Sequence, residues 1–172
     1  PWEYVKKKFR IEKCFGPELF FGIELIKQYP EEKFLFIKRS EGGTSLYGAW
    51  NPNWTLEKAQ LKEEEHKPKL YEDFIDIVDS QLEKLQPGSY EIVGMLWVQG
   101  ESDSGNRHGP LPTETYAENL TSLVKKVREH YKVDDLPFLL LGVGSNKVIN
   151  KMKETSLNPV SYTHLTLPTM LM

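Results

Sequence analysis

Hydrophobic residues follow two different periods along this chain, and segments of the two kinds alternate. Apolar residues recur at helical spacing in three segments, and this spacing predicts amphipathic helices. Three shorter runs are apolar without interruption, which is typical of strands that are buried on both faces of a sheet. The predicted helices are residues 17–29, 70–85 and 116–131, and the predicted strands are residues 33–38, 92–98 and 137–143. This alternation predicts an α/β protein with a parallel sheet covered by helices on both faces.

Prolines, glycines and capping residues mark the ends of the predicted helices. Pro17 suits the first position of the first helix, and Pro87-Gly88 stops the second. Thr113 or Thr115 is a suitable N-cap for the third helix. The charged run Glu63–Lys67 is interpreted as a solvated approach to the second helix.

The last residues of the chain differ from the rest. Residues 160–172 show no amphipathic period, and the string Ser161-Tyr162-Thr163-His164-Leu165-Thr166-Leu167-Pro168-Thr169 resembles translated read-through of a sequencing adapter. We therefore predict that residues 1–159 belong to one domain and that residues 160–172 are a non-native tail.

Composition narrows the class of protein. The length of 172 residues is that of one domain, and the net charge of -3 is too small to favour a nucleic-acid partner. The single cysteine, Cys14, excludes an internal disulfide framework and a cysteine-rich zinc site. No stretch approaches the roughly 18 apolar residues that a membrane span needs. Compartment and oligomeric state stay open.

Two loops that follow predicted strands carry the candidate chemistry, because ligands of open parallel sheets bind beyond the carboxyl ends of the strands. The first contains Gly42-Gly43-Thr44-Ser45, and its glycine pair suits either a tight turn or an array of N–H groups that binds an oxyanion or a phosphate. The second is Gln99-Gly100-Glu101-Ser102-Asp103. Gln99 offers an uncharged N–H donor to a developing oxyanion, and Gly100 permits close approach of a substrate.

Two further residues near the second loop have two readings each. Glu101 either anchors the loop or takes part in catalysis. His108, in the loop 105–110, either lines a substrate groove or is an ordinary exposed histidine.

With these motifs the chain resembles the SGNH hydrolases of the sialate O-acetylesterase and acetylxylan esterase type, which form carbohydrate esterase family six. The resemblance extends from about Phe15 to Ser145. It rests on Phe15-Gly16-Pro17-Glu18-Leu19, on Ile37-Lys38 leading to Gly42-Gly43-Thr44, and above all on residues 97–103, Trp-Val-Gln-Gly-Glu-Ser-Asp.

The resemblance implies a three-layer α/β/α fold with a flavodoxin-like parallel sheet, incomplete here at both ends. It implies removal of O-acetyl groups from a carbohydrate by serine acyl transfer, without a metal or organic cofactor. In such enzymes the oxyanion would be bound by the Gly43 backbone N–H and the Gln99 side chain, with Glu101 as a supporting residue. Substrate contacts would come from Gly42, Thr44, Gly100, Asp103 and His108. Members of the family are often secreted or periplasmic.

The printed sequence departs from the family pattern in two respects. It has no Gly-Gln-Ser-Asn block with the nucleophile, and no Asp three residues before a histidine. We therefore expect the chain by itself to be inactive. The alternative is a non-catalytic, flavodoxin-like carbohydrate-binding module. Nucleotide binding through Gly142-Val143-Gly144 is disfavoured, because the complete Gly-x-Gly-x-x-Gly fingerprint is missing.

Overall fold

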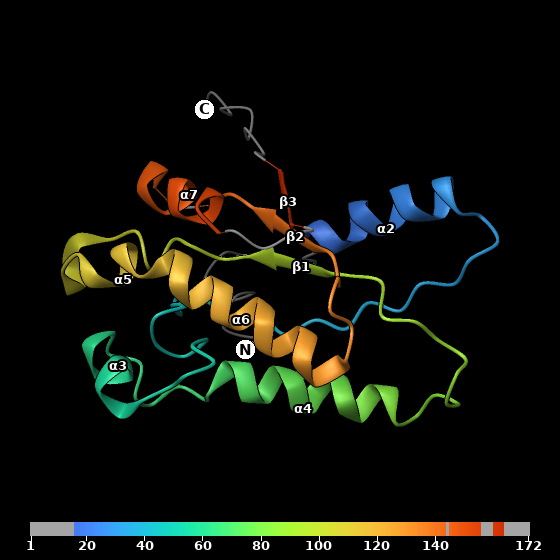
Figure 1. Cartoon of the computed structure of the whole chain (residues 1–172), viewed down its shortest axis with the longest axis horizontal. Coiled ribbons are helices and arrows are strands. Elements are labelled where there is room, and N and C mark those ends of the chain that lie inside the picture. Colours follow the sequence, from blue (N-terminus) through green and yellow to red (C-terminus); the bar gives the residue numbers. More distant parts are fainter. Residues whose placement is uncertain (1–15, 144, 156–159, 164–172) are drawn as a thin grey trace, which may run out of the picture. The chain divides into compact units, whose positions relative to one another are not determined.

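Three short parallel strands form the sheet in the computed structural model of this protein, which describes residues 16–143, 145–155 and 160–163. Strand β1 (Met95–Val98) pairs with β2 (Phe138–Leu141), and β2 pairs with β3 (Val160–Thr163) (Figure 1). The register sets Met95 opposite Phe138, and Phe138 opposite Val160. The prediction of a mixed α/β fold with a parallel sheet is confirmed.

The chain divides into two compact units between Lys38 and Arg39, a boundary that the sequence pattern does not predict. In the described part of the first unit, α2 (Pro17–Gln28) is the helix expected there, with a proline in its first turn. The second unit holds the sheet and the remaining helices, and it contains both candidate loops.

Residues 33–38 form no strand, which corrects the sequence-based prediction. Leu35 and Phe36 expose 61% and 42% of their surface, whereas a central strand would bury both. The aromatic side chains of this segment pack on the region of α2 instead, with the ring of Phe36 6.2 Å from that of Phe21. A short apolar run has no period that separates a strand from an extended segment lying on a helix.

The helices of the second unit include both of those predicted there. Helix α4 ends three residues earlier than expected, and α6 has the expected bounds. Thr115 is at the N-cap of α6, but its hydroxyl donates to the Leu111 carbonyl and accepts from the Asn119 side-chain amide, not from a backbone N–H of the helix. In chain order the helices are α3 (Leu56–Leu61), α4 (Leu70–Leu82), the 3₁₀ helix η1 (Asn106–His108), α5 (Leu111–Glu114), α6 (Tyr116–Tyr131) and α7 (Asn146–Lys153).

Helix α7 is not predicted from the sequence, because its eight residues hold only three apolar side chains, Val148, Ile149 and Met152, and their helical spacing extends over little more than one turn. The strands are also shorter than predicted. β1 begins at Met95, whose N–H donates to the Pro137 carbonyl at 2.9 Å, while Val93 is 64% exposed.

Strand β3 lies in the segment that we predict to be a non-native tail. The structure pairs its backbone with β2, and residues 164–172 lie outside the described residues. The boundary at residue 160 remains a prediction.

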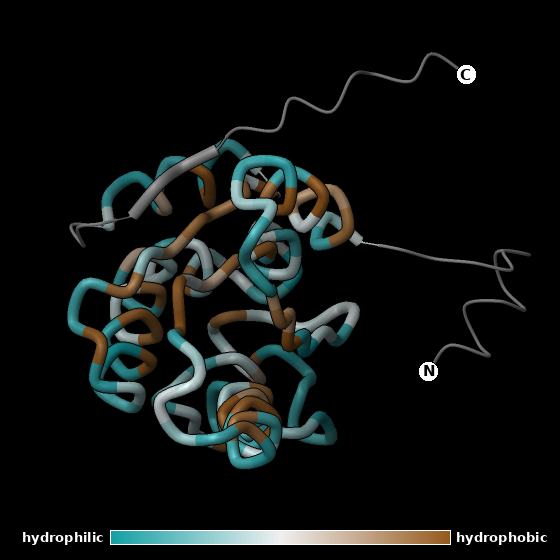
Figure 2. The backbone as a smooth tube through the Cα atoms, turned by 90° about the vertical axis from the view of Figure 1, so that its right-hand side faces the viewer, coloured by the Kyte–Doolittle hydropathy of each residue, from teal (hydrophilic) through white to brown (hydrophobic). Residues whose placement is uncertain are grey.

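A continuous core joins β1 and β2 to α4, α6 and α7. Hydrophobic and hydrophilic residues alternate along the helices (Figure 2), as expected for amphipathic helices that pack on a core. The rings of Trp50 and Trp97 meet edge to face, with 5.3 Å between centroids. The buried cluster consists of Leu46, Ala49, Trp50, Leu70, Trp97, Tyr116, Leu120, Leu123, Val124, Val127, Leu136, Phe138, Leu140, Val148 and Met152.

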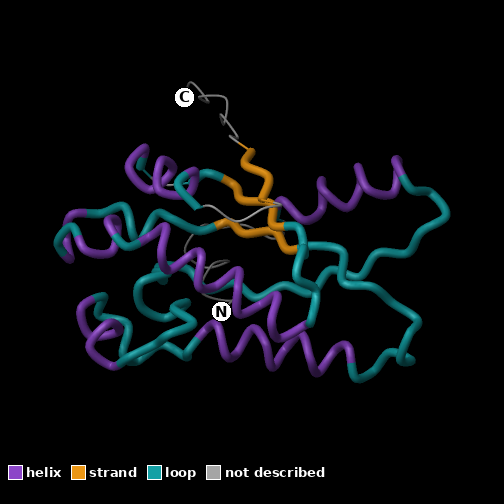
Figure 3. Tube along the Cα trace, viewed as in Figure 1, coloured by secondary structure: helices purple, strands orange, loops and turns teal. Residues whose placement is uncertain are grey.

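Residues 29–55 contain neither helix nor strand and form the long loop drawn in teal between α2 and α3 (Figure 3). Most of residues 44–51 in this loop are nevertheless buried, and Leu46 is fully inaccessible. Irregular backbone inside a protein must find hydrogen-bond partners, and those partners define the candidate site. Among the described helices, none is both long and apolar enough to cross a membrane.

Candidate active site

The two candidate loops lie side by side in the second unit. We call residues 42–49 the glycine loop and residues 99–103 the glutamine block. The Gln99 side-chain nitrogen donates to the Thr44 carbonyl at 3.2 Å, and the Asp103 carboxylate accepts from the backbone N–H of Leu46 at 2.8 Å. These bonds join positions 55 and 57 residues apart in sequence. The loops that carry Gly43 and Gln99 are therefore in contact, through Thr44, the residue after Gly43.

Gln99 follows β1 directly and is held from several sides. Its side chain is 7% exposed, and Nε2 donates to an Asp103 oxygen at 2.6 Å as well as to Thr44. The Tyr116 hydroxyl lies 2.9 Å from the Gln99 carbonyl and 3.0 Å from Gln99 Oε1, so its one hydrogen is shared between these acceptors, and its oxygen accepts from Trp97 Nε1. Burial raises the pKa of Tyr116, so the phenol remains a donor at any physiological pH. These contacts fix the orientation of the amide.

Gly43 lies on the exposed side of the glycine loop. Its φ angle is 68°, in the left-handed region that glycine adopts without strain, and a methyl group built on it would meet no atom within 4 Å. Within the described residues, its N–H has no protein acceptor. The backbone donor expected for an oxyanion is therefore open to an incoming group, as is Gly42 beside it.

Two residues expected among the substrate contacts are buried instead. Asp103 is 0% and Thr44 is 4% exposed. The Thr44 hydroxyl donates to the Glu41 carbonyl and accepts from Trp50 Nε1, so its bonds are made to the residues that flank the glycine loop. In this structure Asp103 and Thr44 support the site from behind rather than face a ligand.

The remaining predicted site residues, Gly100, Glu101 and His108, have different surroundings. Gly100 packs against the carbonyl of Val143, and an added Cβ would lie 2.5 Å from that oxygen, so the close approach is to protein backbone rather than to substrate. Glu101 has an exposed side chain, while its carbonyl accepts from Ser104 N–H at 3.1 Å. His108 lies half-buried at the end of η1.

Glu64 is a residue that the sequence reading missed. The run Glu63–Lys67 was expected to be solvated, yet Glu64 is only 3% exposed. Its Oε2 accepts from the Ser45 hydroxyl at 3.0 Å and from Ala49 N–H at 2.7 Å. Glu63 adopts a φ of 55°, and this turn after α3 directs Glu64 inward while Glu63 and Glu65 stay exposed. A charged run gives no sign of which member turns inward.

The site therefore holds two buried carboxyl groups and one buried lysine. Burial raises the pKa of Glu64, against the opposing effect of its hydrogen bonds from Ala49 and Ser45. Burial likewise raises the pKa of Asp103, opposed by hydrogen bonds from Gln99, Leu46 and Tyr47. Lys62, 6% exposed, donates to the Ser102 carbonyl at 2.7 Å and lowers the pKa of both acids through its charge.

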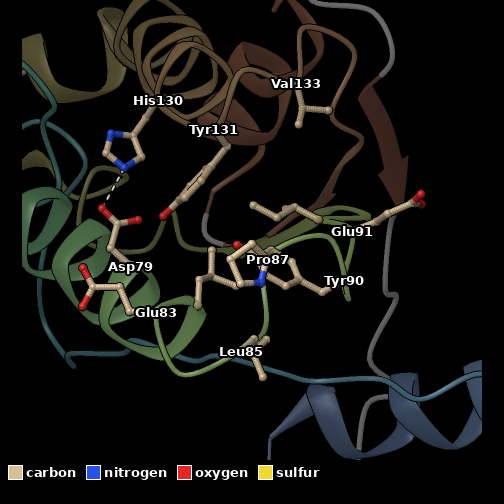
Figure 4. A pocket seen from close by; sticks show the side chains of 11 residues that line it. Asp79, Glu83, Leu85, Pro87, Tyr90, Glu91, His130, Tyr131 and Val133 are labelled. Atoms are coloured by element: carbon tan, nitrogen blue, oxygen red, sulfur yellow. Dashed lines mark hydrogen bonds and ion pairs between the residues drawn. The ribbon is translucent and has the colours of Figure 1, made fainter.

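A separate groove lies at the opposite edge of the sheet (Figure 4). Its lining comes from segments that precede β1 and β2, including Tyr90, Ile92 and Tyr131, and His130 bonds Asp79 there at 2.8 Å. Since β1 and β2 are parallel, this edge is the amino-terminal one. None of the predicted site residues lines it. Among the described residues, no group of three or more His, Cys, Asp or Glu side chains is arranged to hold a metal ion.

Comparison with known proteins agrees with the geometry. The sequence model of the family described as "Carbohydrate esterase, sialic acid-specific acetylesterase" matches residues 2–168. The chain belongs to this carbohydrate esterase family. A probable carbohydrate esterase from Arabidopsis thaliana is 31% identical over 98 residues, which are 56% of this chain and 35% of the plant protein.

The match thus spans about a third of the length of that curated relative. The solved structure of the same Arabidopsis protein is 27% identical to this chain, covers 60% of it and 43% of its own chain, and has a TM-score of 0.48.

Proposed function

We propose that the protein to which this domain belongs removes O-acetyl groups from a carbohydrate by serine acyl transfer, on a three-layer α/β/α fold of the SGNH type. In this proposal the chain supplies the oxyanion-binding part of the active site. The observation that carries it is the direct bond between the glutamine block and the glycine loop, Gln99 Nε2 to the Thr44 carbonyl. This bond sets Gln99 against the residue that follows Gly43, which supports a shared role for the two donors.

The proposed reaction begins with attack of a serine hydroxyl on the acetyl carbonyl, which turns the carbonyl oxygen into an oxyanion. Gly43 would donate its backbone N–H, which no described protein group occupies. Collapse of the intermediate would expel the sugar hydroxyl and leave an acetyl-serine that water hydrolyses. The serine and its histidine base belong to blocks that the printed sequence lacks, so we propose that this chain alone is inactive.

Gln99 can join in this step only by exchanging one of its present partners. Both hydrogens of its amide are used, one on Asp103 at 2.6 Å and one on the Thr44 carbonyl at 3.2 Å. The bond to a carboxylate is the stronger kind. The oxyanion would therefore replace the Thr44 carbonyl, while Asp103 continues to hold the amide.

The proposed partner is an acetylated sugar, and the exposure of Gly42 and the partial exposure of His108 are compatible with a contact to it. The reaction requires no metal or organic cofactor. Neither a nucleic-acid nor a membrane partner is proposed.

The proposal is tested by steady-state kinetics of full-length Gln99→Ala and Gln99→Glu on an acetylated sugar. Loss of one oxyanion donor lowers kcat on the order of 10²-fold or more, with a smaller change in KM. Gln99→Glu should be at least as damaging, because a carboxylate repels both the oxyanion and Asp103. Thermal melts identify unfolded variants. Wild-type kcat in a folded Gln99→Ala protein would leave the glutamine block with a structural role only.

One observation favours the alternative, a non-catalytic carbohydrate-binding module: the hydrogens of Gln99 are already paired within the protein. The two functions differ in their flanking sequence and in their product. An upstream Gly-Gln-Ser-Asn block, a downstream Asp-x-x-His block and release of acetate identify the esterase. Binding of the sugar without release of acetate identifies the module.

A further inference from the structure

We propose that Glu64 is a positioning residue of the active site, and that with Asp103 it clamps residues 45–49 of the glycine loop between two buried carboxylates. This inference rests on the proposed function, because it assigns Glu64 to the support of the oxyanion-binding loop. Glu64 touches no predicted substrate contact directly. It acts through Ser45 and Ala49.

On the Glu64 side, one oxygen atom makes both bonds to the loop. Oε2 accepts from the Ser45 hydroxyl at 3.0 Å and from Ala49 N–H at 2.7 Å. The Ser45 oxygen in turn accepts from Gly48 N–H at 2.9 Å. The loop therefore closes around a single carboxylate oxygen.

On the Asp103 side, both oxygens are used. Oδ1 accepts from Tyr47 N–H at 3.0 Å. Oδ2 accepts from Leu46 N–H at 2.8 Å and from Gln99 Nε2 at 2.6 Å. Every donor that Asp103 binds would be left unpaired in a buried place if the oxygen it uses were lost.

Together the two acids bind donors from four of the five positions 45–49, namely Ser45, Leu46, Tyr47 and Ala49, and the fifth, Gly48, is bonded to the Ser45 hydroxyl. This segment begins two residues after Gly43, whose N–H direction depends on the path of the chain that follows it. Donors to a developing oxyanion are effective when they are held in place before the reaction. The clamp supplies that rigidity where helix and strand are absent.

Glu64 uses one carboxylate oxygen and Asp103 uses both, so substitution of each acid by its amide should have different effects. In Glu64→Gln the amide oxygen can occupy the position of Oε2 and accept both bonds, so the clamp should persist. In Asp103→Asn one of the two used oxygens becomes an NH₂ group, which faces a backbone N–H whichever way the amide is turned. Both substitutions replace an ionisable acid with a neutral amide, so a role that depends on charge alone predicts equal effects.

Amide hydrogen exchange in the 172-residue chain tests the clamp without reference to activity. We expect exchange of Ala49 N–H to accelerate at least about tenfold in Glu64→Leu and to stay near wild type in Glu64→Gln. Exchange of Leu46 and Tyr47 should accelerate in Asp103→Asn. Equal behaviour of Glu64→Gln and Asp103→Asn, or unchanged Ala49 exchange in Glu64→Leu, would overturn the proposal.

If Glu64→Leu or Asp103→Asn does not fold, Ser45→Ala provides a milder test. It removes the donor to Glu64 and the acceptor of Gly48 N–H together, and exchange of Gly48 should accelerate while that of Leu46 and Tyr47 stays slow. Unchanged exchange at Gly48 would contradict the clamp.

Kinetics of the full-length protein test the link to catalysis. We expect Glu64→Leu to lower kcat between about 10- and 100-fold with KM nearly unchanged, and Glu64→Gln to restore kcat. A clamp seen by exchange together with an inactive wild type would refute the proposed function and leave the clamp standing. A clamp seen by exchange together with full kcat in Glu64→Leu would refute the positioning role.

Discussion

Gly48 and Glu64 are in such close contact that no side chain fits between them. A Cβ built on Gly48 would lie 2.4 Å from Glu64 Oε2 and 3.0 Å from the Ser45 hydroxyl oxygen. Both neighbours are held by the hydrogen bonds of the loop, so neither can retreat without breaking a bond. Glycine is needed at position 48 because there is no room for a side chain.

Gly48→Ala is accordingly expected to destabilise the chain by roughly 1–3 kcal/mol, as overpacking of a filled interior does. The measurement is the free energy of unfolding in urea. Gly105→Ala is the matched control, since a Cβ there meets nothing within 4 Å and its effect should stay within about 0.5 kcal/mol. Equal stabilities of the two variants would show that the Gly48 contact is not tight.

The pKa of Glu64 predicts how its contribution to stability depends on pH. Burial raises the folded-state pKa above the ordinary value of 4.5, so the folded protein binds this proton more tightly than the unfolded chain does. The contribution of Glu64 is then fully present below pH 4.5 and is lost as the pH rises through the raised pKa.

The prediction is measured by urea unfolding of wild type and Glu64→Gln across a pH series from about 4 to 8. The unfolding free energy of wild type minus that of Glu64→Gln should fall as the pH rises and then level off. Asp103 titrates in the same direction for the same reason, and because it is retained in Glu64→Gln most of its effect cancels. A difference that grows with pH would mean that the fold stabilises the ionised Glu64.

The 172-residue chain is expected not to hydrolyse p-nitrophenyl acetate, because its serines lack a histidine partner in any recognised block. The comparison is with Ser45→Ala/Ser102→Ala, and the two proteins should give equal rates. The Ser45 hydroxyl is bonded to a carboxylate, not to an imidazole. Saturable activity that disappears in the double variant would show that the chain carries its own nucleophile.

The motif at residues 97–103 was the most informative part of the sequence. It indicated the family that the match over residues 2–168 shows, and it pointed to an encounter between Gln99 and the glycine loop. That encounter could be predicted because loops at the carboxyl edge of a parallel sheet converge. Yet residues 33–38, which were predicted to be the strand that precedes the glycine loop, form no strand. The expectation about the loops was met although one of its premises failed.

Local pattern also determined the long helices. α4 and α6 have apolar residues at regular helical spacing, and this periodicity is a property of the sequence itself. The same periodicity did not predict the bounds of α7 or of the short strands. Val148 and Met152 have helical spacing, but α7 has only eight residues, and their burial follows from packing in the shared core.

By itself, then, the sequence determined the α/β class, the amphipathic helices and the two loops that carry polar chemistry, since each depends on residues close together along the chain. Only the tertiary structure decided which polar residues are buried. Glu64 and Glu65 are identical residues next to each other in sequence. Glu64 is only 3% exposed and is bonded to the glycine loop, whereas Glu65 is exposed to solvent. Asp103 is likewise made a buried acceptor by Leu46 and Tyr47, 57 and 56 positions away. Burial of a charge is stable only where distant backbone donors surround it, and that condition is met by the fold as a whole.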